Sequence, residues 1–175
     1  MGMGAPRFEV LIPHDQIQQR VAELGRQISA DYVGRPLVMV GVLKGSFMFL
    51  ADLIRHIDAP LRIEFIGTKS YEGTTTSGQV QLTKDLDRPI QDEDVLLVED
   101  IIDTGLTLNY LKHLLEQREP RSLKTVAFLD KPSRRRIEVR GDYVGFTIED
   151  RFVVGYGLDF EQRYRNLPDL CVLVP

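Results

Sequence analysis

The sequence predicts an α/β fold in which a mostly parallel sheet is flanked by helices. Two observations predict it. Short, continuous apolar runs, which are typical of strands buried on both faces, recur along the chain. Between them lie segments whose apolar residues repeat at helical spacing. Such alternation favours parallel strands joined by helices, and ligands bind such sheets where the strands end.

The first half of the chain supplies two predicted strands and two predicted helices. Residues 15–30 carry apolar residues every three or four positions, which predicts an amphipathic helix. Residues 67–78 are rich in Gly, Thr and Ser and have no apolar face, so we expect a long loop, of the kind that is often functional. The remaining elements are a strand over 37–43, a helix over 47–56 and a strand over 61–66.

The second half continues the alternation and ends in short strands. With 175 residues in total, the chain is expected to form a single domain over 1–175. The predicted elements are strands over 95–98 and 125–129, a helix over 107–117, and short strands over 143–146, 152–154 and 170–174.

Composition narrows the class of protein. The formal net charge of -4 does not indicate a nucleic-acid surface, and no apolar run is long enough to span a bilayer. Cys171 is the only cysteine and lies in an apolar run, so it is interpreted as a small buried hydrophobe. We therefore expect a soluble, cytoplasmic protein that binds neither nucleic acid nor membrane.

The stretch from Val95 to Thr107 carries the functional argument. An apolar strand ends in two adjacent carboxylates, Glu99 and Asp100, and a turn containing Asp103, two threonines and a glycine leads into a helix. A helix N-terminus offers unpaired N–H groups and partial positive charge, which suit a phosphate. The turn residues that would bind it are Asp103, Thr104, Gly105, Leu106 and Thr107.

The adjacent acidic pair calls for a different ligand group. Glu99 and Asp100 would repel phosphate, but carboxylates accept hydrogen bonds from a sugar diol and bind magnesium. A phosphate beside a diol describes a ribose 5-phosphate. A capped helix preceded by a solvated acidic turn is the simpler alternative, and the full strand, acidic pair and Thr/Gly loop make it the weaker one.

This stretch resembles the phosphoribosyl pyrophosphate signature of the type I phosphoribosyltransferases, and the chain resembles their hypoxanthine-guanine branch from about residue 9 to 174. The resemblance implies that family's fold, with a small hood formed by the N-terminal segment and about 131–175, and a flexible lid at about 68–80. It also implies Mg²⁺ as the cofactor and a homodimer or homotetramer. Some relatives carry lysine in place of Leu106, so only its backbone N–H is assigned to phosphate.

The resemblance further implies a pyrophosphate site and a lid. Leu43, Lys44 and Gly45 match the family's pyrophosphate loop, in which the peptide bond corresponding to Leu43-Lys44 is cis. Ser70 and Tyr71 match the pair with which the lid covers the pyrophosphate. Arg165 matches the arginine that grips it, where a charged fork is apt.

The resemblance also implies a purine site near the C-terminus. Lys131 would donate a hydrogen bond to the 6-oxo group of the base. An ammonium can only donate, and adenine has no oxo group at this position to accept the bond. Phe152 would stack on the base and Val153 would bind its edge, while Leu158 would line the pocket. Metal binding is assigned to Glu99, Asp100 and Asp159, the last of which would hold a second magnesium beside the purine site.

The implied reaction transfers ribose 5-phosphate from phosphoribosyl pyrophosphate to N9 of hypoxanthine or guanine, giving IMP or GMP in purine salvage. Asp103 is the expected catalytic base near purine N7. Two alternatives stay open: a transferase that prefers xanthine, and a regulator that senses phosphoribosyl pyrophosphate and binds nucleic acid. Arg134-Arg135-Arg136 is interpreted as a solvated basic turn, because no RNA-binding motif accompanies it.

Overall fold

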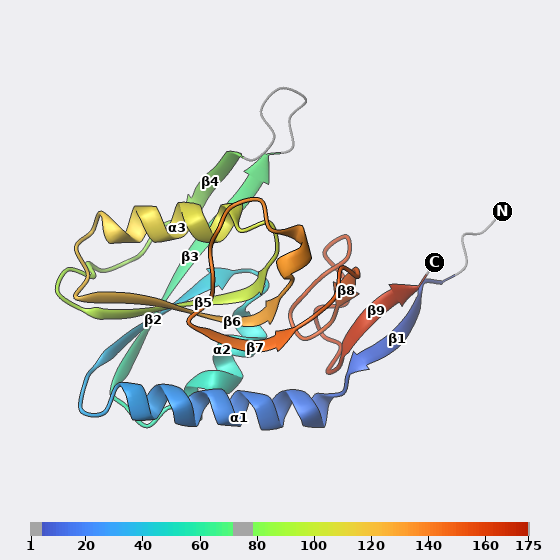
Figure 1. Ribbon diagram of the computed structural model, residues 1–175, viewed down its shortest axis with the longest axis horizontal. Coiled ribbons are helices and arrows are strands. Elements are labelled where there is room, and N and C mark those ends of the chain that lie inside the picture. Colours follow the sequence, from blue (N-terminus) through green and yellow to red (C-terminus); the bar gives the residue numbers. More distant parts are fainter. Residues whose placement is uncertain (1–4, 72–78, 175) are drawn as a thin grey trace.

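Two sheets organise the protein, and helices cover both faces of the larger one (Figure 1). The computed structural model describes residues 5–71 and 79–174. In chain order the elements are β1 (Arg7–Ile12), α1 (His14–Asp31), β2 (Leu37–Leu43), α2 (Phe47–Ile54), β3 (Leu61–Tyr71), β4 (Gln79–Lys84), β5 (Asp94–Ile102), α3 (Leu106–Glu116), β6 (Ser122–Asp130), the single 3₁₀ turn η1 (Pro132–Arg134), β7 (Tyr143–Thr147), β8 (Val153–Val154) and β9 (Leu170–Val174).

The larger sheet has the strand order β4-β3-β2-β5-β6-β7. Every neighbouring pair from β3 to β7 is parallel, and only the edge strand β4 runs antiparallel. The chain passes from β2 to β3 on one side and later returns to place β5 on the other side of β2. The strand order thus reverses between β2 and β5, which is where ligands bind in such sheets.

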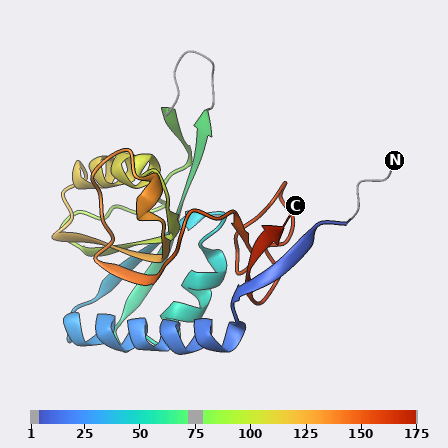
Figure 2. The same cartoon turned by 45° about the vertical axis from the view of Figure 1, so that its right-hand side comes forward.

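Strand β2 shows how the apolar runs specify this architecture. Its residues alternate between two cores, because successive side chains of a strand point to opposite faces. Met39 packs in the core beneath α1 and α2, whereas Val40 packs in the core beneath α3. Figures 1 and 2 show α1 and α2 on one face of the sheet and α3 on the other. The predicted α/β fold with a mostly parallel sheet and flanking helices is therefore confirmed.

The smaller sheet joins the two ends of the chain. Its order is β1-β9-β8, all antiparallel, so that Arg7 pairs with Val174 and Val153 pairs with Val172. It lies beyond the carboxyl ends of the large sheet's strands (Figure 2). This is the hood formed by N- and C-terminal segments. Strand β1 has no counterpart among the strands expected from the sequence.

The prediction of a loop over 67–78 was wrong for residues 67–71. Strand β3 continues through Gly67 to Tyr71, and β4 pairs with it from Gln79. Alternate residues of β4 are exposed, and the half-buried ones between them include Leu82, which packs against the core beneath α3. The rest of the expected loop, residues 72–78, lies outside the described part of the chain.

Two smaller expectations can also be compared with the structure. Cys171 is buried, as its apolar surroundings predicted. Among the described residues, none of the helices combines the length and apolar character needed to cross a bilayer.

Candidate active site

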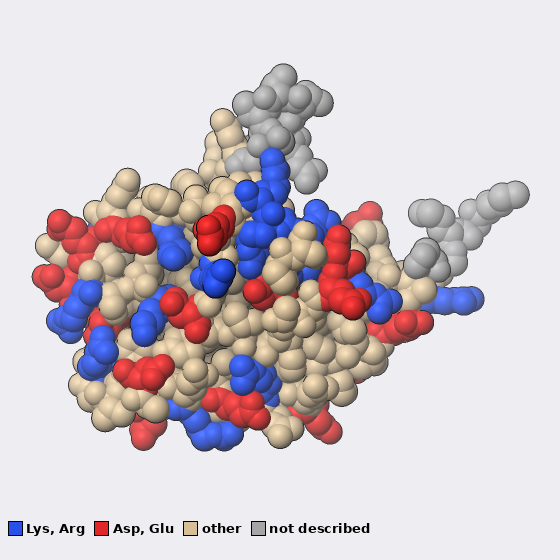
Figure 3. Space-filling view, in the orientation of Figure 1, with Lys and Arg blue, Asp and Glu red and all other residues tan. Residues whose placement is uncertain are grey.

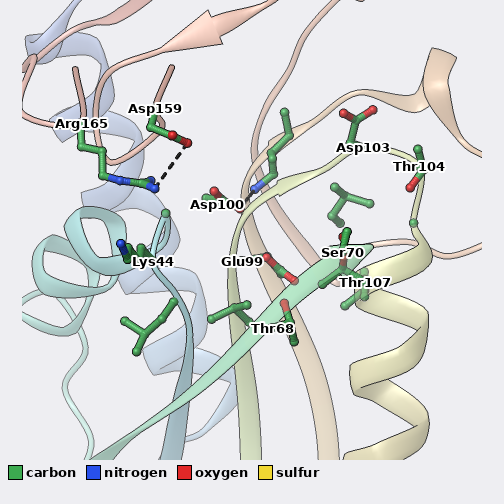
Figure 4. Close-up of a pocket in the computed structure, with 17 residues that line it drawn as sticks. Lys44, Thr68, Ser70, Glu99, Asp100, Asp103, Thr104, Thr107, Asp159 and Arg165 are labelled. Atoms are coloured by element: carbon green, nitrogen blue, oxygen red, sulfur yellow. Dashed lines mark hydrogen bonds and ion pairs between the residues drawn. The ribbon is translucent and has the colours of Figure 1, made fainter. Parts of the chain in front are cut away.

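A cavity of about 420 Å³ opens between the carboxyl ends of β2 and β5, at the position where the strand order reverses. Figure 4 shows its labelled side chains in three groups. Lys44, Asp159 and Arg165 lie on one side, whereas Asp103, Thr104 and Thr107 lie on the other, and the acidic pair Glu99 and Asp100 lies between them.

The acidic pair lies deep in the cavity because it occupies the last residues of the buried strand β5. Glu99 is only 4% exposed. Burial, and next the charge of Asp100, raises the pKa of Glu99 well above its ordinary value. Burial also raises the pKa of Asp100. Two buried carboxylates side by side disfavour each other's charge, so a cation or hydroxyl donors between them would relieve the cost.

The residues assigned to magnesium can bind that ion only together with oxygen atoms from water or the substrate. Glu99, Asp100 and Asp159 all line the 420 Å³ cavity. Within the described chain, however, no three acidic, histidine or cysteine side chains converge closely enough to hold a metal by themselves. Magnesium usually takes one or two carboxylates together with water and substrate phosphates. The donors therefore suit an ion that the substrate helps to hold.

The start of α3 provides the anion-binding end of the cavity. Gly105 precedes the helix with a φ of +87°, and a Cβ at this position would meet Val139 Cγ1 at 2.6 Å. The N-cap residue Gly105 has no side chain to cap the helix, and the Leu106 N–H donates to Oγ1 of Thr104 at 3.4 Å. Thr104, Gly105 and Thr107 line the cavity, whereas the Leu106 side chain lies in a separate hollow on the outer face of α3, leaving only its backbone for an anion.

The loop after β2 forms the opposite end. The peptide bond between Leu43 and Lys44 is cis, as the family resemblance implied, and both residues and Gly45 line the cavity. Nζ of Lys44 donates to Oε1 of Gln162 at 3.3 Å, and Nη2 of Arg165 donates to the same oxygen at 3.1 Å. Two cationic side chains thus converge on one acceptor oxygen, as they could on a pyrophosphate oxygen.

Arg165 is held in place by the C-terminal segment. Its Nη1 donates to the Gly157 carbonyl at 2.7 Å, and its Nη2 lies 3.4 Å from Oδ1 of Asp159, the pair that is dashed in Figure 4. Gly157 has a φ of +96°, and its Cα lies so close to the Gly45 carbonyl that a Cβ would lie 2.3 Å from that oxygen. The C-terminal segment is therefore packed directly on the loop after β2.

Strand β3 brings part of the expected lid to the cavity. Thr68 and Ser70 line it, and both come from the strand and not from a loop. Tyr71 is the last residue of β3, and its side chain lies outside the described part of the structure, as does the stretch 72–78.

A second cavity, of about 310 Å³, adjoins the first and contains the residues assigned to the purine. The side chain of Lys131 is buried at its wall, with Nζ 3.9 Å from Oδ1 of Asp150. Phe152 is 53% exposed and meets Phe160 edge-on, with ring centroids 5.7 Å apart. An aromatic face left open beside a buried ammonium suits a flat base that carries an oxo group. Val153 and Leu158 complete the wall.

Asp103 and its neighbours join the two cavities. Asp100, Ile101, Asp103 and Asp159 line both of them, so a ligand that fills one can reach into the other. The first cavity would hold a phosphorylated sugar, and the second would place a base next to it.

The interpretation of Arg134-Arg135-Arg136 as a solvated basic turn holds for Arg134 and Arg136, which are exposed, but was wrong for Arg135, whose side chain is only 16% exposed. Arg134 lies beside Asp103, and Arg135 donates to the Asp103 carbonyl at 2.8 Å and forms an ion pair with Asp130. Figure 3 shows basic and acidic side chains gathered side by side on this face. No sequence motif identified Arg134 or Arg135 as site residues, because η1 contacts the turn between β5 and α3 only in the folded chain. Gln162 was missed for the same reason, since its acceptor role depends on two distant cations.

Comparison with known proteins places the chain among relatives of defined class. A family model described as the phosphoribosyl transferase domain matches residues 11–161. A hypoxanthine-guanine phosphoribosyltransferase of Staphylococcus aureus (strain Mu50) is 51% identical over 95% of this chain and 94% of its own length. A bifunctional protein TilS/HprT of Listeria monocytogenes is 47% identical over 95% of this chain, which spans only 26% of that relative's length.

The solved structures agree with the sequence relatives. A crystal structure of a hypoxanthine phosphoribosyltransferase from Staphylococcus aureus superposes with a TM-score of 0.92 at 50% identity, covering 95% of this chain and 91% of the other. The part matched by the family model includes β2, β5 and α3 and every residue that lines the first cavity except Arg165. The chain belongs to the phosphoribosyltransferase family, in the branch of the hypoxanthine-guanine phosphoribosyltransferases.

Proposed function

We propose that this chain transfers the 5-phosphoribosyl group of phosphoribosyl pyrophosphate to N9 of hypoxanthine or guanine, giving IMP or GMP and pyrophosphate in purine salvage. One arrangement carries the proposal. A buried acidic pair lies between two anion-binding ends, one at the start of α3 and the other at Lys44 and Arg165 (Figure 4). A ribose with a phosphate on one carbon and a pyrophosphate on another matches this arrangement, because it has an anion for each end and hydroxyl groups for the acidic pair between them.

Binding would place each part of the sugar against its own group of residues. The 5-phosphate accepts hydrogen bonds from Thr104, Thr107 and the N–H groups at the start of α3. The ribose hydroxyls donate to Glu99 and Asp100. The pyrophosphate lies against Lys44 and Arg165, in the position where the Gln162 oxygen now accepts from both.

The base would enter the second cavity. Lys131 donates to O6 of the purine, and its burial makes a base without an acceptor there costly, because the ammonium would lose its partner. Phe152 stacks on the purine face. The Val153 backbone binds the base edge and Leu158 lines the pocket, which directs N9 toward the sugar in the first cavity.

The reaction exchanges one bond for another at the anomeric carbon of ribose. Its bond to the pyrophosphate oxygen breaks, the leaving oxygen takes the electron pair, and N9 supplies the pair of the new bond. The purine then loses one proton, and Asp103, which lines both cavities, accepts it near N7. Enclosure of the site keeps water from competing with N9 for the positively charged sugar.

Magnesium is the proposed cofactor, held by Glu99, Asp100 and Asp159 together with oxygens of the substrate. Bound there, it supplies positive charge that stabilises the departing pyrophosphate. The ion also explains how a carboxylate-lined cavity accepts a polyanion. A cytoplasmic location and a homodimer or homotetramer stay predictions, and sedimentation of the purified chain tests the oligomeric state.

A panel of bases tests the proposal directly. The chain is incubated with phosphoribosyl pyrophosphate, magnesium and either hypoxanthine, guanine, xanthine or adenine, and pyrophosphate release is measured. Hypoxanthine and guanine should be converted, and a chelator should abolish the reaction. Faster conversion of adenine would refute the base assignment, and preference for xanthine would replace it. Tight nucleic-acid binding at physiological salt without any pyrophosphate release would indicate a regulator instead.

Replacement of the proposed base separates chemistry from binding. Asp103→Asn should lower kcat by roughly 10²–10⁴-fold, the range that general base catalysis supplies. Binding of phosphoribosyl pyrophosphate, measured by calorimetry, should be retained, because the phosphate contacts come from neighbouring residues. Unchanged turnover would remove Asp103 from this role.

A further inference from the structure

We propose that Arg134 is a positioning residue for Asp103, holding its carboxylate on the purine side of the boundary between the two cavities. The inference rests on the proposed function, in which Asp103 receives the purine proton. Nε of Arg134 lies 3.0 Å from Oδ1 of Asp103. Within the described chain this is the one cationic side chain in an ion pair with that carboxylate.

The carboxylate needs such a partner because of its surroundings. Oδ1 of Asp103 is buried and accepts no aligned hydrogen bond from any described residue, so the ion pair with Arg134 is its compensation. The same residue lines the cavity that contains Glu99 and Asp100, and a bound phosphate would add further negative charge. An adjacent guanidinium offsets this repulsion, which would otherwise move the carboxylate.

The position of Arg134 sets the direction of its pull. Arg134 lines the second cavity, proposed for the purine and called the purine cavity here. It does not line the first, the sugar-phosphate cavity, whereas Asp103 lines both. Figure 4 shows the Asp103 carboxylate directed away from Thr107 at the start of α3. A cation on that side draws the carboxylate toward the base and away from the phosphate.

The backbone around Arg134 is tied to the loop that carries Asp103. The Arg136 N–H donates to the Thr104 carbonyl at 2.8 Å, and the Lys131 N–H donates to the Ile102 carbonyl at 2.9 Å. These two bonds flank Arg134 and Asp103 in the chain. The ion pair therefore joins two segments whose separation is already fixed, so little conformational freedom is lost in forming it.

A second acidic partner connects Arg134 with the base-recognition lysine. Nη1 of Arg134 lies 3.6 Å from Oδ1 of Asp150, and Nζ of Lys131 lies 3.9 Å from the same oxygen. Arg134 is thus held by a second carboxylate while it pairs with Asp103. Ion pairs therefore connect Asp103, the proposed catalytic base, through Arg134 and Asp150 to Lys131, the residue proposed to recognise the purine.

A double-mutant cycle tests the assignment, with hypoxanthine as substrate and magnesium present. Arg134→Met should lower kcat by about 10-fold, because a displaced catalytic group loses turnover, while KM for phosphoribosyl pyrophosphate stays within about twofold. On the Asp103→Asn background, the same substitution should change kcat by less than about twofold. Arg134→Lys, which keeps a charge but not the planar fork, should recover part of the lost turnover.

Arg136→Met is the matched control, since the Arg136 side chain is exposed and has no ion pair with any described residue. It should leave kcat unchanged. Equal losses from Arg134→Met on both backgrounds, no loss at all, or a loss confined to KM for phosphoribosyl pyrophosphate would each overturn the assignment. Failure of the parent chain to release pyrophosphate with any 6-oxopurine would instead refute the proposed function.

Discussion

The Cα of Gly45 lies directly against the carboxylate of Asp100, so that a Cβ built on this glycine would be 1.8 Å from Oδ2. Gly45→Ala must therefore displace either the loop after β2 or the acidic pair. We expect kcat/KM for phosphoribosyl pyrophosphate to fall about 100-fold, as for other small displacements at reacting centres. Steady-state kinetics at saturating base measure it.

Gly34→Ala is the control for that substitution. Gly34 has a φ of +69°, and a Cβ there would meet nothing within 4 Å. This variant should lose about 1 kcal/mol of stability from backbone strain while retaining its kinetics. If Gly45→Ala also kept full kcat/KM, the contact with Asp100 would have no part in the site.

Lys131 is the residue on which base choice is predicted to depend. Lys131→Met removes the ammonium that would donate to the 6-oxo group, and kcat/KM for hypoxanthine should fall about 10- to 100-fold, the worth of a charged hydrogen bond. Any conversion of adenine should rise, because adenine offers no acceptor there and the cost of leaving the buried ammonium unpaired is removed with it. Lys124→Met, on the exposed part of the same strand β6, should change neither rate.

Phe152 should contribute to binding of the base and little to folding. Because its side chain is 53% exposed, Phe152→Leu should change the free energy of unfolding by less than about 0.5 kcal/mol. Loss of stacking should raise KM for hypoxanthine about three- to tenfold. Urea denaturation and steady-state kinetics on the same preparation separate the two effects. A large loss of stability with unchanged KM would identify Phe152 as a core residue.

Asp94 should make stability depend on pH at the end of β5 remote from the site. Its side chain is fully buried, and two hydrogen bonds from Arg35, at 2.7 and 3.1 Å, hold the pKa of this carboxyl below its usual range. A lowered pKa means that the ionised form stabilises the fold at neutral pH. That contribution is lost as the pH falls from the unfolded-state value, about 3.9, through the folded-state value.

Asp94→Asn should therefore cost about 2–3 kcal/mol at pH 7, somewhat below the cost of breaking a fully buried pair because Arg35 is half-exposed. The deficit should shrink below pH 4. Urea denaturation over this pH range measures it, with Asp85→Asn as the control. Asp85 is paired with Arg118 but half-exposed, so its replacement should cost less than about 1 kcal/mol. A deficit for Asp94→Asn that did not change with pH would contradict the mechanism.

The sequence was most informative where a local pattern determines the structure. Strands 37–43 and 170–174 were predicted with the bounds that the structure has, because continuous apolar runs require burial on both faces. The turn from Glu99 to Thr107 was placed at a strand end before a helix, which is where it lies. In each case neighbouring residues carry the information.

The features that sequence reasoning missed depend on distant partners. Half of the residues of strand β1 are exposed, and the strand pairs with β9, at the other end of the chain. In β4 the apolar alternation is only two residues long, Val80 and Leu82, which is too short to separate the strand from the Gly/Thr/Ser-rich stretch before it. Arg134 resembles any surface arginine until η1 folds against Asp103. In both the β1 and the Arg134 pairings, the partner lies far away in the sequence.

The joining of the two chain ends in one small sheet has a consequence for how selectivity can change. Val153 of the purine cavity belongs to β8, which pairs with β9. The segment between β8 and β9 also carries Asp159 and Arg165, which line the sugar-phosphate cavity. Under the proposed function, a substitution that shifts this segment should therefore alter both which base is accepted and how the sugar donor is held.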